Sequence, residues 1–278
     1  MRKTITAGGI ASRFYHHHHD QIFAKRYNSP FWLRRYAHRA IYAGFLPHIE
    51  AGLHVLDSGC GEGVLSILMG RGGAKVTAAD ISWPNVKVAY RVVELAELPI
   101  ELLIANAEQL PFADNSFDVV VSSHVLEHLP DVTKGLMELH RVARGLVLIA
   151  MPTCFNPAAW ALLGGDSYWQ VTRRSLFATP LGLFRTLLAL IGRQEGPNEG
   201  YAGRGELPHI WRFPWVMRRQ IESVGLRVIR WEAGPLIVPY LAEYLPIFRR
   251  LQPWLDQWGT KPIVRYLGYG SLVICEKS

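Results

Sequence analysis

The chain has 278 residues, of which 49% are hydrophobic and 19% are charged, so it can bury a sizeable core and does not have the composition of a disordered protein. Its 30 lysines and arginines exceed its 23 aspartates and glutamates, which gives a formal net charge of +7. Because this excess is spread along the chain without a dense basic stripe, nucleic acid is not expected as a partner. An anionic membrane surface or an acidic substrate stays open.

The cysteines and the N-terminal segment indicate in which cellular compartment the protein is expected. Cys60, Cys154 and Cys275 lie far apart and form no CxxC pair, so neither a zinc site nor a disulfide framework is indicated. The first residues contain no apolar stretch long enough for a signal peptide. We therefore expect a reducing, cytoplasmic location, with a flexible arm over residues 1–20 and one domain over 21–278.

Residues 21–49 mix aromatic and basic side chains. Such a mixture could bind RNA, but it is more often the apolar and solvated faces of one helix. Pro30 is suited to a first helical turn, and the pattern that follows predicts a helix over 31–46.

A glycine-rich turn follows the first predicted strand, 53–57, and precedes a helix predicted over 63–70. Gly59 and Gly61 can adopt positive φ and allow a ligand to approach the backbone closely. The turn leads into a helix N-terminus, where free N–H groups point outward. This stretch is therefore the first candidate for ligand binding.

Apolar strands alternate with helices through the next hundred residues. This rhythm is typical of a parallel sheet covered by helices on both faces. Farther along the chain, 226–231 and 271–275 are also predicted strands, the last of them antiparallel, and 213–224 is a predicted helix. The other strands expected are 75–80, 100–105, 117–123 and 146–150. A helix is expected to start at Ser82 and Pro84 and to end before Pro99, with a buried stripe of Ala89, Val92, Val93 and Ala96. A helical turn is expected at 125–129 and a helix at 131–144.

Polar side chains stand where four of the predicted strands end. They are Asp57, Asp80, Asn106 and Ser123. In open sheets of this kind ligands bind outside the carboxyl ends of the strands, so these residues are expected to line a binding site.

Two segments interrupt the rhythm and are expected to be insertions, 153–207 and 235–262. Within the first, residues 175–192 are strongly apolar but contain Pro180 and Arg185. They could span a membrane, lie on its surface, or form a lid over the domain. Because the first insertion follows the fifth strand, we expect it to overhang the site as an acceptor lid or cap, together with the second.

Four motifs, taken together, resemble class I S-adenosylmethionine-dependent methyltransferases, and most closely the broad group that includes quinone-biosynthesis enzymes. The resemblance covers about 21–152 and 206–277 and departs at Asn106, where aspartate is usual. His209, followed by a helix and Gly225, resembles a segment found late in the chains of that family. The motifs are Val55–Gly63, Asp80, Asn106–Phe112 and Phe117–Leu129.

The resemblance implies a Rossmann-like α/β fold with a mostly parallel seven-stranded sheet, and S-adenosylmethionine as cofactor. An acidic turn that carries Glu62 suits a cationic sulfonium better than a phosphate. The turn would hold the methionine part, Asp80 the ribose and the 106–108 loop the adenine. The implied cofactor-binding residues are Asp57, Gly59, Cys60, Gly61, Asp80, Ile81, Asn106, Ala107, Glu108 and Ser123.

Three histidines are candidates for a general base, His124, His128 and His209. Because the donor is already activated, aligning the reactants can supply most of the catalysis, and a base is needed only if the acceptor must lose a proton. His124 and His128 also have a spacing that could bind a metal, but no third ligand is evident from the sequence, so no metal is expected.

The expected function is methyl transfer to a small-molecule or lipid-like acceptor. Residues 175–192 could contact a membrane surface, and the oligomeric state is left open. Two alternatives remain at this point: an oxidoreductase with a nucleotide cofactor, and a binding module without catalysis on the same fold.

Overall fold

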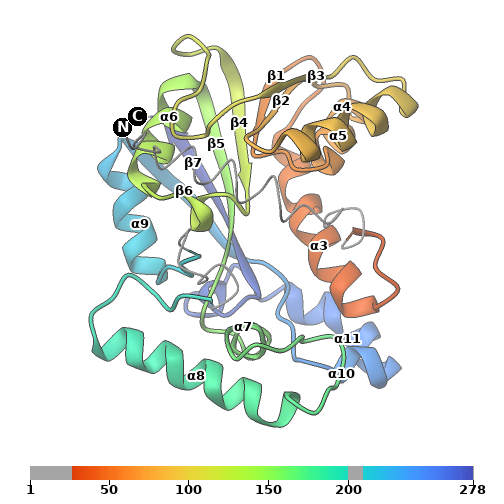
Figure 1. Cartoon of the computed structure of the whole chain (residues 1–278), viewed down its shortest axis with the longest axis vertical. Helices are drawn as coiled ribbons and strands as arrows, with labels where there is room; N and C mark the ends of the chain where they lie inside the picture. Colours follow the sequence, from red (N-terminus) through yellow and green to blue (C-terminus); the bar gives the residue numbers. More distant parts are fainter. Residues whose placement is uncertain (1–26, 200–208, 278) are drawn as a thin grey trace, which may run out of the picture.

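The computed structural model describes residues 27–199 and 209–277. The arm expected over 1–20 lies outside the described residues, as do residues 200–207 of the first expected insertion. Figure 1 shows a central sheet with helices on both sides and a helical group at one end.

The sheet has seven strands in the order β3-β2-β1-β4-β5-β7-β6. Strands β1 to β5 pair in parallel, whereas β7 is antiparallel to both of its neighbours, β5 and β6. The Rossmann-like class and the antiparallel last strand, both expected from the sequence, are confirmed. The strands are β1 (His54–Ser58), β2 (Lys75–Asp80), β3 (Glu101–Ile104), β4 (Phe117–Ser123), β5 (Ala143–Pro152), β6 (Leu226–Ala233) and β7 (Gly270–Lys277).

Helices pack on both faces of this sheet. Side chains of α6 and α9 belong to one hydrophobic cluster, and side chains of α3 and α4 belong to another, so the two pairs cover opposite faces (Figure 1). The helices of this layer are α3 (Trp32–Phe45), α4 (Val64–Arg71), α5 (Trp83–Leu95), α6 (Val132–Val142) and α9 (Pro214–Ser223), with short 3₁₀ turns η1 (Leu46–His48), η2 (Leu126–His128) and η3 (Val264–Tyr266).

Local sequence explains where these helices begin. The Ser82 hydroxyl accepts a hydrogen bond from the backbone N–H of Asn85 at 3.4 Å, and Pro84 lies in the first turn of α5, as expected. Asp131 caps α6 in the same way through the N–H groups of Thr133 and Lys134.

Two expectations about helices are wrong. The helix expected over 131–144 ends at Val142, because Ala143 and the residues after it already pair with β4, and Gly145 lies inside β5. Val92 was expected in the buried stripe of α5, but its side chain is exposed; Val86, Ala89 and Val93 form that stripe.

The insertions contain the remaining helices, α7 (Pro157–Leu163), α8 (Ser175–Ile191), α10 (Leu241–Tyr244) and α11 (Pro246–Asp256). They lie at the lower end of the view in Figure 1, beyond the end of β5. No helix within 27–199 or 209–277 combines the length and hydrophobicity needed to cross a bilayer.

Hydrogen bonds join the two insertions. The backbone N–H of Tyr240 donates to the Tyr168 carbonyl at 2.8 Å, and the Tyr240 hydroxyl donates to the Ser167 carbonyl at 3.0 Å. The N–H of Val171 donates to the Tyr244 hydroxyl at 3.1 Å. The described parts of the two insertions are therefore joined to each other.

Candidate active site

The first strand ends in a buried carboxylate. Asp57 accepts a hydrogen bond from the Ser66 hydroxyl of α4 at 2.6 Å. Burial raises the pKa of Asp57 to about 6; the Ser66 hydrogen bond opposes this shift, whereas the nearby charge of Asp80 adds to it. Asp57 therefore fixes the start of α4 against the end of β1.

The glycine turn is held in a conformation that other residues rarely adopt. Gly59 has φ +82°, and a Cβ atom added there would overlap the side chain of Val125. The backbone N–H groups of Gly59 and Cys60 both donate to the Ala79 carbonyl, at 2.7 and 2.9 Å. The turn is thus fixed between the ends of β2 and β4.

Asp80, at the end of β2, is the second buried carboxylate. Its two oxygens accept hydrogen bonds from the backbone N–H groups of Gly61 at 2.9 Å and Ser82 at 2.8 Å. Burial raises its pKa, and these hydrogen bonds oppose the shift. A carboxylate can accept about four hydrogen bonds, so capacity remains for ligand hydroxyl groups. Ile81 follows directly and is half-buried.

The loop after β3 has its own internal hydrogen bonds. The Asn106 side-chain oxygen accepts from the N–H of Glu108 at 3.0 Å, and the Glu108 carboxylate accepts from the N–H of Asp131 at 2.7 Å. Ala107 packs against the hydrophobic core. The side chains of Asn106 and Glu108 thus shape the loop, which leaves its backbone as the part most available to a ligand.

The end of β4 carries Ser123 and His124. The Ser123 hydroxyl is buried and has no hydrogen-bond partner among residues 27–199 and 209–277. His124 has φ +56°, and its N–H donates to the Ala150 carbonyl at 2.9 Å. A non-glycine residue in this conformation at a strand end is the kind of local strain that functional sites retain.

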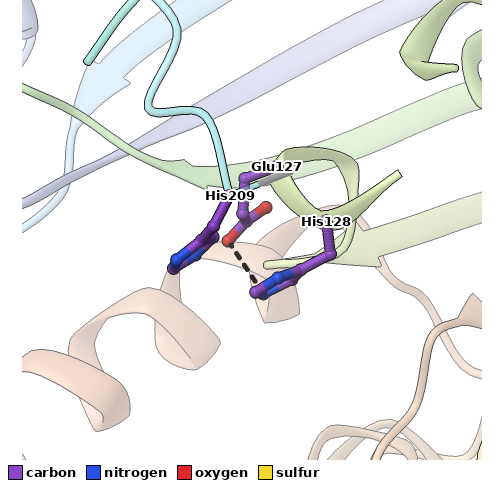
Figure 2. A group of neighbouring side chains, drawn as sticks. All are labelled: Glu127, His128 and His209. Atoms are coloured by element: carbon purple, nitrogen blue, oxygen red, sulfur yellow. Dashed lines mark ion pairs between the residues drawn. The ribbon is translucent and has the colours of Figure 1, made fainter. Parts of the chain in front are cut away.

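Glu127, in η2, is the polar centre of the site. Its carboxylate is buried and lies 3.1 Å from Nδ1 of His124. It is 4.0 Å from Nε2 of His128, as Figure 2 shows with a dashed line. Burial raises its pKa, but the His124 hydrogen bond and the nearby His128 and His209 outweigh burial and lower it to about 2. Because an ionised carboxylate only accepts hydrogen bonds, Nδ1 of His124 must carry the proton.

His209 follows the first insertion in the chain and lies close to Glu127 in the fold. Its ring stacks on that of His128, with centroids 4.2 Å apart and planes 10° from parallel. Its Nδ1 lies 2.7 Å from a carboxylate oxygen of Glu199. The N–H of Glu199 donates to the His209 carbonyl, and the N–H of Ile210 donates to the Glu127 carbonyl, so the backbone fixes this position.

The structure brings together the three histidines that were predicted from the sequence and adds two carboxylates that were not. Glu127 belongs to the Phe117–Leu129 motif, which could have drawn attention to it. For Glu199 the sequence offers no such signal, because its partner His209 is brought to it only by the folded insertion.

The expectation of no metal relied on the lack of a third ligand, and that reason is wrong. Potential ligand atoms of Glu127, His128 and His209 lie within 4.8 Å of one another (Figure 2). The two stacked rings direct their in-plane lone pairs side by side and not toward a common point. One ring would therefore have to turn before the three groups could form a tetrahedral metal site.

The donor set fits the cofactor expected from the sequence. Two buried aspartates, the buried Ser123 hydroxyl and the outward N–H groups at the start of α4 surround the glycine turn. An acidic set of this kind suits a ligand that carries an amino group, a positive sulfur and ribose hydroxyls. The buried thiol of Cys60 has a pKa raised well above its usual value by burial, so it does not act as a thiolate nucleophile.

Known proteins resemble this chain in sequence and in fold. A family model described as a methyltransferase domain matches residues 56–149. A ubiquinone biosynthesis O-methyltransferase of Ruegeria pomeroyi is 35% identical over 159 residues, which are 54% of this chain and 64% of that protein. One from a Ruegeria species is 32% identical over 171 residues, 59% of this chain and 68% of that protein.

Several curated relatives are matched over about half to two thirds of their length. Among solved structures, magnesium protoporphyrin IX methyltransferase from Synechocystis with bound S-adenosylmethionine has a TM-score of 0.57 and 14% identity, with 100% of both chains covered. That likeness concerns the fold. The motifs, the fold and the relatives together show that the chain belongs to the class I S-adenosylmethionine-dependent methyltransferases, whose cofactor is S-adenosylmethionine.

Proposed function

We propose that this chain transfers a methyl group from S-adenosylmethionine to an oxygen atom of a hydrophobic small molecule. The observation that carries the proposal is the meeting, at the carboxyl edge of the sheet, of a glycine turn, two buried aspartates and an oriented histidine. The names of the relatives support oxygen as the acceptor atom, because those proteins are O-methyltransferases of ubiquinone biosynthesis.

In this proposal the turn from Asp57 to Gly61, Cys60 included, holds the methionine part of the cofactor, and Asp80 with Ile81 binds the ribose. The backbone of Asn106, Ala107 and Glu108 contacts the adenine, and Ser123 lies beside the reacting centre. When bound, S-adenosylmethionine supplies a methyl group already activated by its positive sulfur. The residues therefore act mainly by binding and alignment.

His124 is the proposed general base. Its Nδ1–H donates to Glu127, and its Nε2 has no partner among the described residues. A neutral imidazole that donates through one nitrogen can accept a proton at the other, so Nε2 is suited to take the proton of an acceptor hydroxyl. The negative charge of Glu127 then stabilises the imidazolium that forms.

His128 and His209 are the other candidates for this role. Their stacked imidazole rings form a flat surface next to Glu127, with polar nitrogen atoms at the ring edges. In the proposal this surface contacts the acceptor, and either histidine could replace His124 as the base. Kinetics of single His→Gln variants at the three positions separate the roles: loss of the base lowers kcat, whereas loss of an acceptor contact raises KM.

The insertions 153–207 and 235–262 are proposed to cover the acceptor as a lid or cap. The first of them leaves the sheet directly after β5, whose carboxyl end adjoins His124. A lipid-like acceptor and contact of residues 175–192 with a membrane surface are part of the proposal. The apolar character of α8 supports both.

Calorimetric titration of S-adenosylmethionine tests the cofactor site. Asp80→Ala is expected to bind at least about tenfold more weakly than wild type, since the ligand hydroxyl groups lose the charged carboxylate to which they would donate hydrogen bonds. Asp80→Asn keeps an acceptor for the Gly61 N–H and shows whether any loss arises from a disturbed turn. Glu94→Ala, an exposed acid on α5, is the matched control.

Equal tight binding by wild type and Asp80→Ala, or no binding by either, would contradict the proposal. Titration of NADH in the same experiment tests the oxidoreductase alternative, and tight NADH binding would favour it. Binding of S-adenosylmethionine without methyl transfer to any acceptor would favour a binding module.

A further inference from the structure

Helix α8 is apolar around most of its circumference, yet only one narrow stripe of it is buried. Ala178, Gly182, Thr186 and Ala189 form that stripe and pack closely on α7. A Cβ atom on Gly182 would overlap the Trp160 carbonyl, so the two backbones approach each other closely. Eight large apolar side chains of α8 remain exposed, and Leu176 and Ile191 expose 77% and 79% of their surface. Contiguous exposed apolar surface of this kind indicates a docking surface.

The charged residues of the α8 segment itself have one sign, and the acid nearest its start, Asp166, accepts hydrogen bonds from the hydroxyl groups of Thr172 and Ser175. Between residues 167 and 194 the only charged residues are Arg173, Arg174, Arg185 and Arg193. Arg173 and Arg174 are exposed just before the helix, and Arg193 is exposed just after it. An apolar helix with cations at both ends is the pattern of helices that lie in the interface of an anionic bilayer.

The second insertion adds a similar surface. In and beside α11, Ile247, Leu251, Trp254 and Trp258 are exposed, together with the cation Arg250. Tryptophan is enriched at membrane interfaces because its ring is apolar and its N–H is polar. The hydrogen bonds of Tyr240 and Tyr244 join this insertion to the segment that leads into α8, and Figure 1 shows both helices at the same end of the molecule.

We propose that α8 and α11 together form one platform that docks the protein on an anionic lipid bilayer. This inference rests on the proposed function, which it deepens by naming the source of the acceptor: a molecule that leaves the bilayer would enter beneath the two insertions. The apolar faces insert at the depth of the headgroups, and the flanking arginines contact lipid phosphates.

A second copy of the chain is a poorer occupant of this surface. In an antiparallel symmetric pair, Arg173 and Arg174 of one copy would approach Arg193 of the other, and in a parallel pair identical arginines would meet. Residues 167–194 contain no acid, and the neighbouring Asp166 already accepts hydrogen bonds from Thr172 and Ser175, so such pairings bring mainly cations against cations.

Flotation with lipid vesicles tests the platform without any methyl-transfer readout, so its failure is distinct from failure of the proposed methyl transfer. Wild type is expected to float with vesicles of phosphatidylcholine and phosphatidylglycerol, much less with phosphatidylcholine alone, and less at high salt. The double variant Phe177→Glu/Phe184→Glu and the single variant Trp254→Glu place charges in the two apolar faces. We expect the double variant to lower the partition coefficient at least about tenfold.

Tyr90→Glu/Leu95→Glu is the matched control. It adds the same two charges at exposed apolar positions of α5, and we expect it to change partition less than about twofold. Two triple variants test the contribution of the flanking positive charges alone. Arg173→Gln/Arg174→Gln/Arg193→Gln should remove the preference for anionic vesicles, whereas the exposed-cation control Arg71→Gln/Lys87→Gln/Arg91→Gln should keep it.

Unfolding temperature and S-adenosylmethionine affinity show that each variant is folded. Three results would overturn the platform: no flotation of wild type with anionic vesicles, an equal loss in the Tyr90/Leu95 control, or a concentration-dependent dimer that the Phe177/Phe184 variant abolishes in place of vesicle binding.

Discussion

Glu127 is the residue around which the polar part of the site is arranged. It lies buried between three histidines, and its charge is maintained because hydrogen bonding and the nearby imidazoles outweigh the cost of burial. Removing one member of such a network leaves other buried groups without partners, so its effect on function and on stability must be measured together.

We expect Glu127→Gln to lower kcat by about ten- to a hundredfold, because His124 loses the anion that orients it and stabilises its protonated form. The affinity for S-adenosylmethionine should stay within about twofold, since Glu127 does not adjoin the glycine turn. Steady-state kinetics and calorimetry check both parts. His54→Gln, an exposed histidine on β1, should leave kcat unchanged. Unchanged turnover in Glu127→Gln would rule out its positioning role.

The raised pKa of Asp57 predicts the direction in which the free energy of unfolding changes with pH. Its pKa is about 6 in the folded state and 3.8 in the reference state, so the folded protein binds more protons between these values. Its contribution therefore makes the free energy of unfolding fall as pH rises from about 4 to about 6, by about 3 kcal/mol at most. Denaturant unfolding should show that Asp57→Asn gains stability relative to wild type across this range, and that Glu94→Gln does not. A constant difference at all pH values would contradict the burial effect.

At the scale of elements, the strands and the helices next to them follow from apolar runs and from caps such as Ser82, which is why their positions could be predicted. The turn at Gly59 was also predictable, because positive φ and close approach both require glycine. Only the C-terminal end of the helix expected over 131–144 was missed, since pairing of Ala143 with β4 overrides the helical pattern there.

Gly59 offers a test of the turn. Alanine at this position would adopt an unfavourable φ and would overlap Val125, so we expect a loss of about 2–4 kcal/mol in the free energy of unfolding and a marked loss of cofactor affinity. Gly52 has φ +85° with open space around it, so Gly52→Ala isolates the backbone strain, about 1–2 kcal/mol. Equal effects of the two substitutions would mean that the contact with Val125 is unimportant.

Gly182 offers a test of the packing of α8. A Cβ atom there would displace α8 from α7, so Gly182→Ala should speed hydrogen exchange of α8 amides at least about tenfold while cofactor affinity stays unchanged. Gly165→Ala lies in the same insertion, at φ +89° but in open space, so it adds only local backbone strain and should leave α8 protected. Undiminished protection in Gly182→Ala would show that the close approach of the backbones is not needed.

At the scale of the whole molecule, the arrangement of one half of the site could be predicted from the sequence, whereas in the other half His128 and His209 could be singled out but their meeting with Glu127 could not. Asp57, Asp80 and Ser123 stand at strand ends, where a parallel sheet always gathers them at one edge. The group of Glu127, His128 and His209 joins residues about eighty positions apart. Only the pairing of 195–199 with 209–213 and the docking of Ile210 on Glu127 bring them together, and no local pattern encodes those contacts.

The central claim is that this site transfers a methyl group, and the most direct measurement uses the labelled donor. Wild type is incubated with S-adenosylmethionine that carries a labelled methyl group, together with a fractionated extract of lipids and small molecules. The account predicts label in an apolar product, with at least about tenfold less in His124→Gln and Glu127→Gln. Tight binding of the donor with no label in any fraction would contradict it.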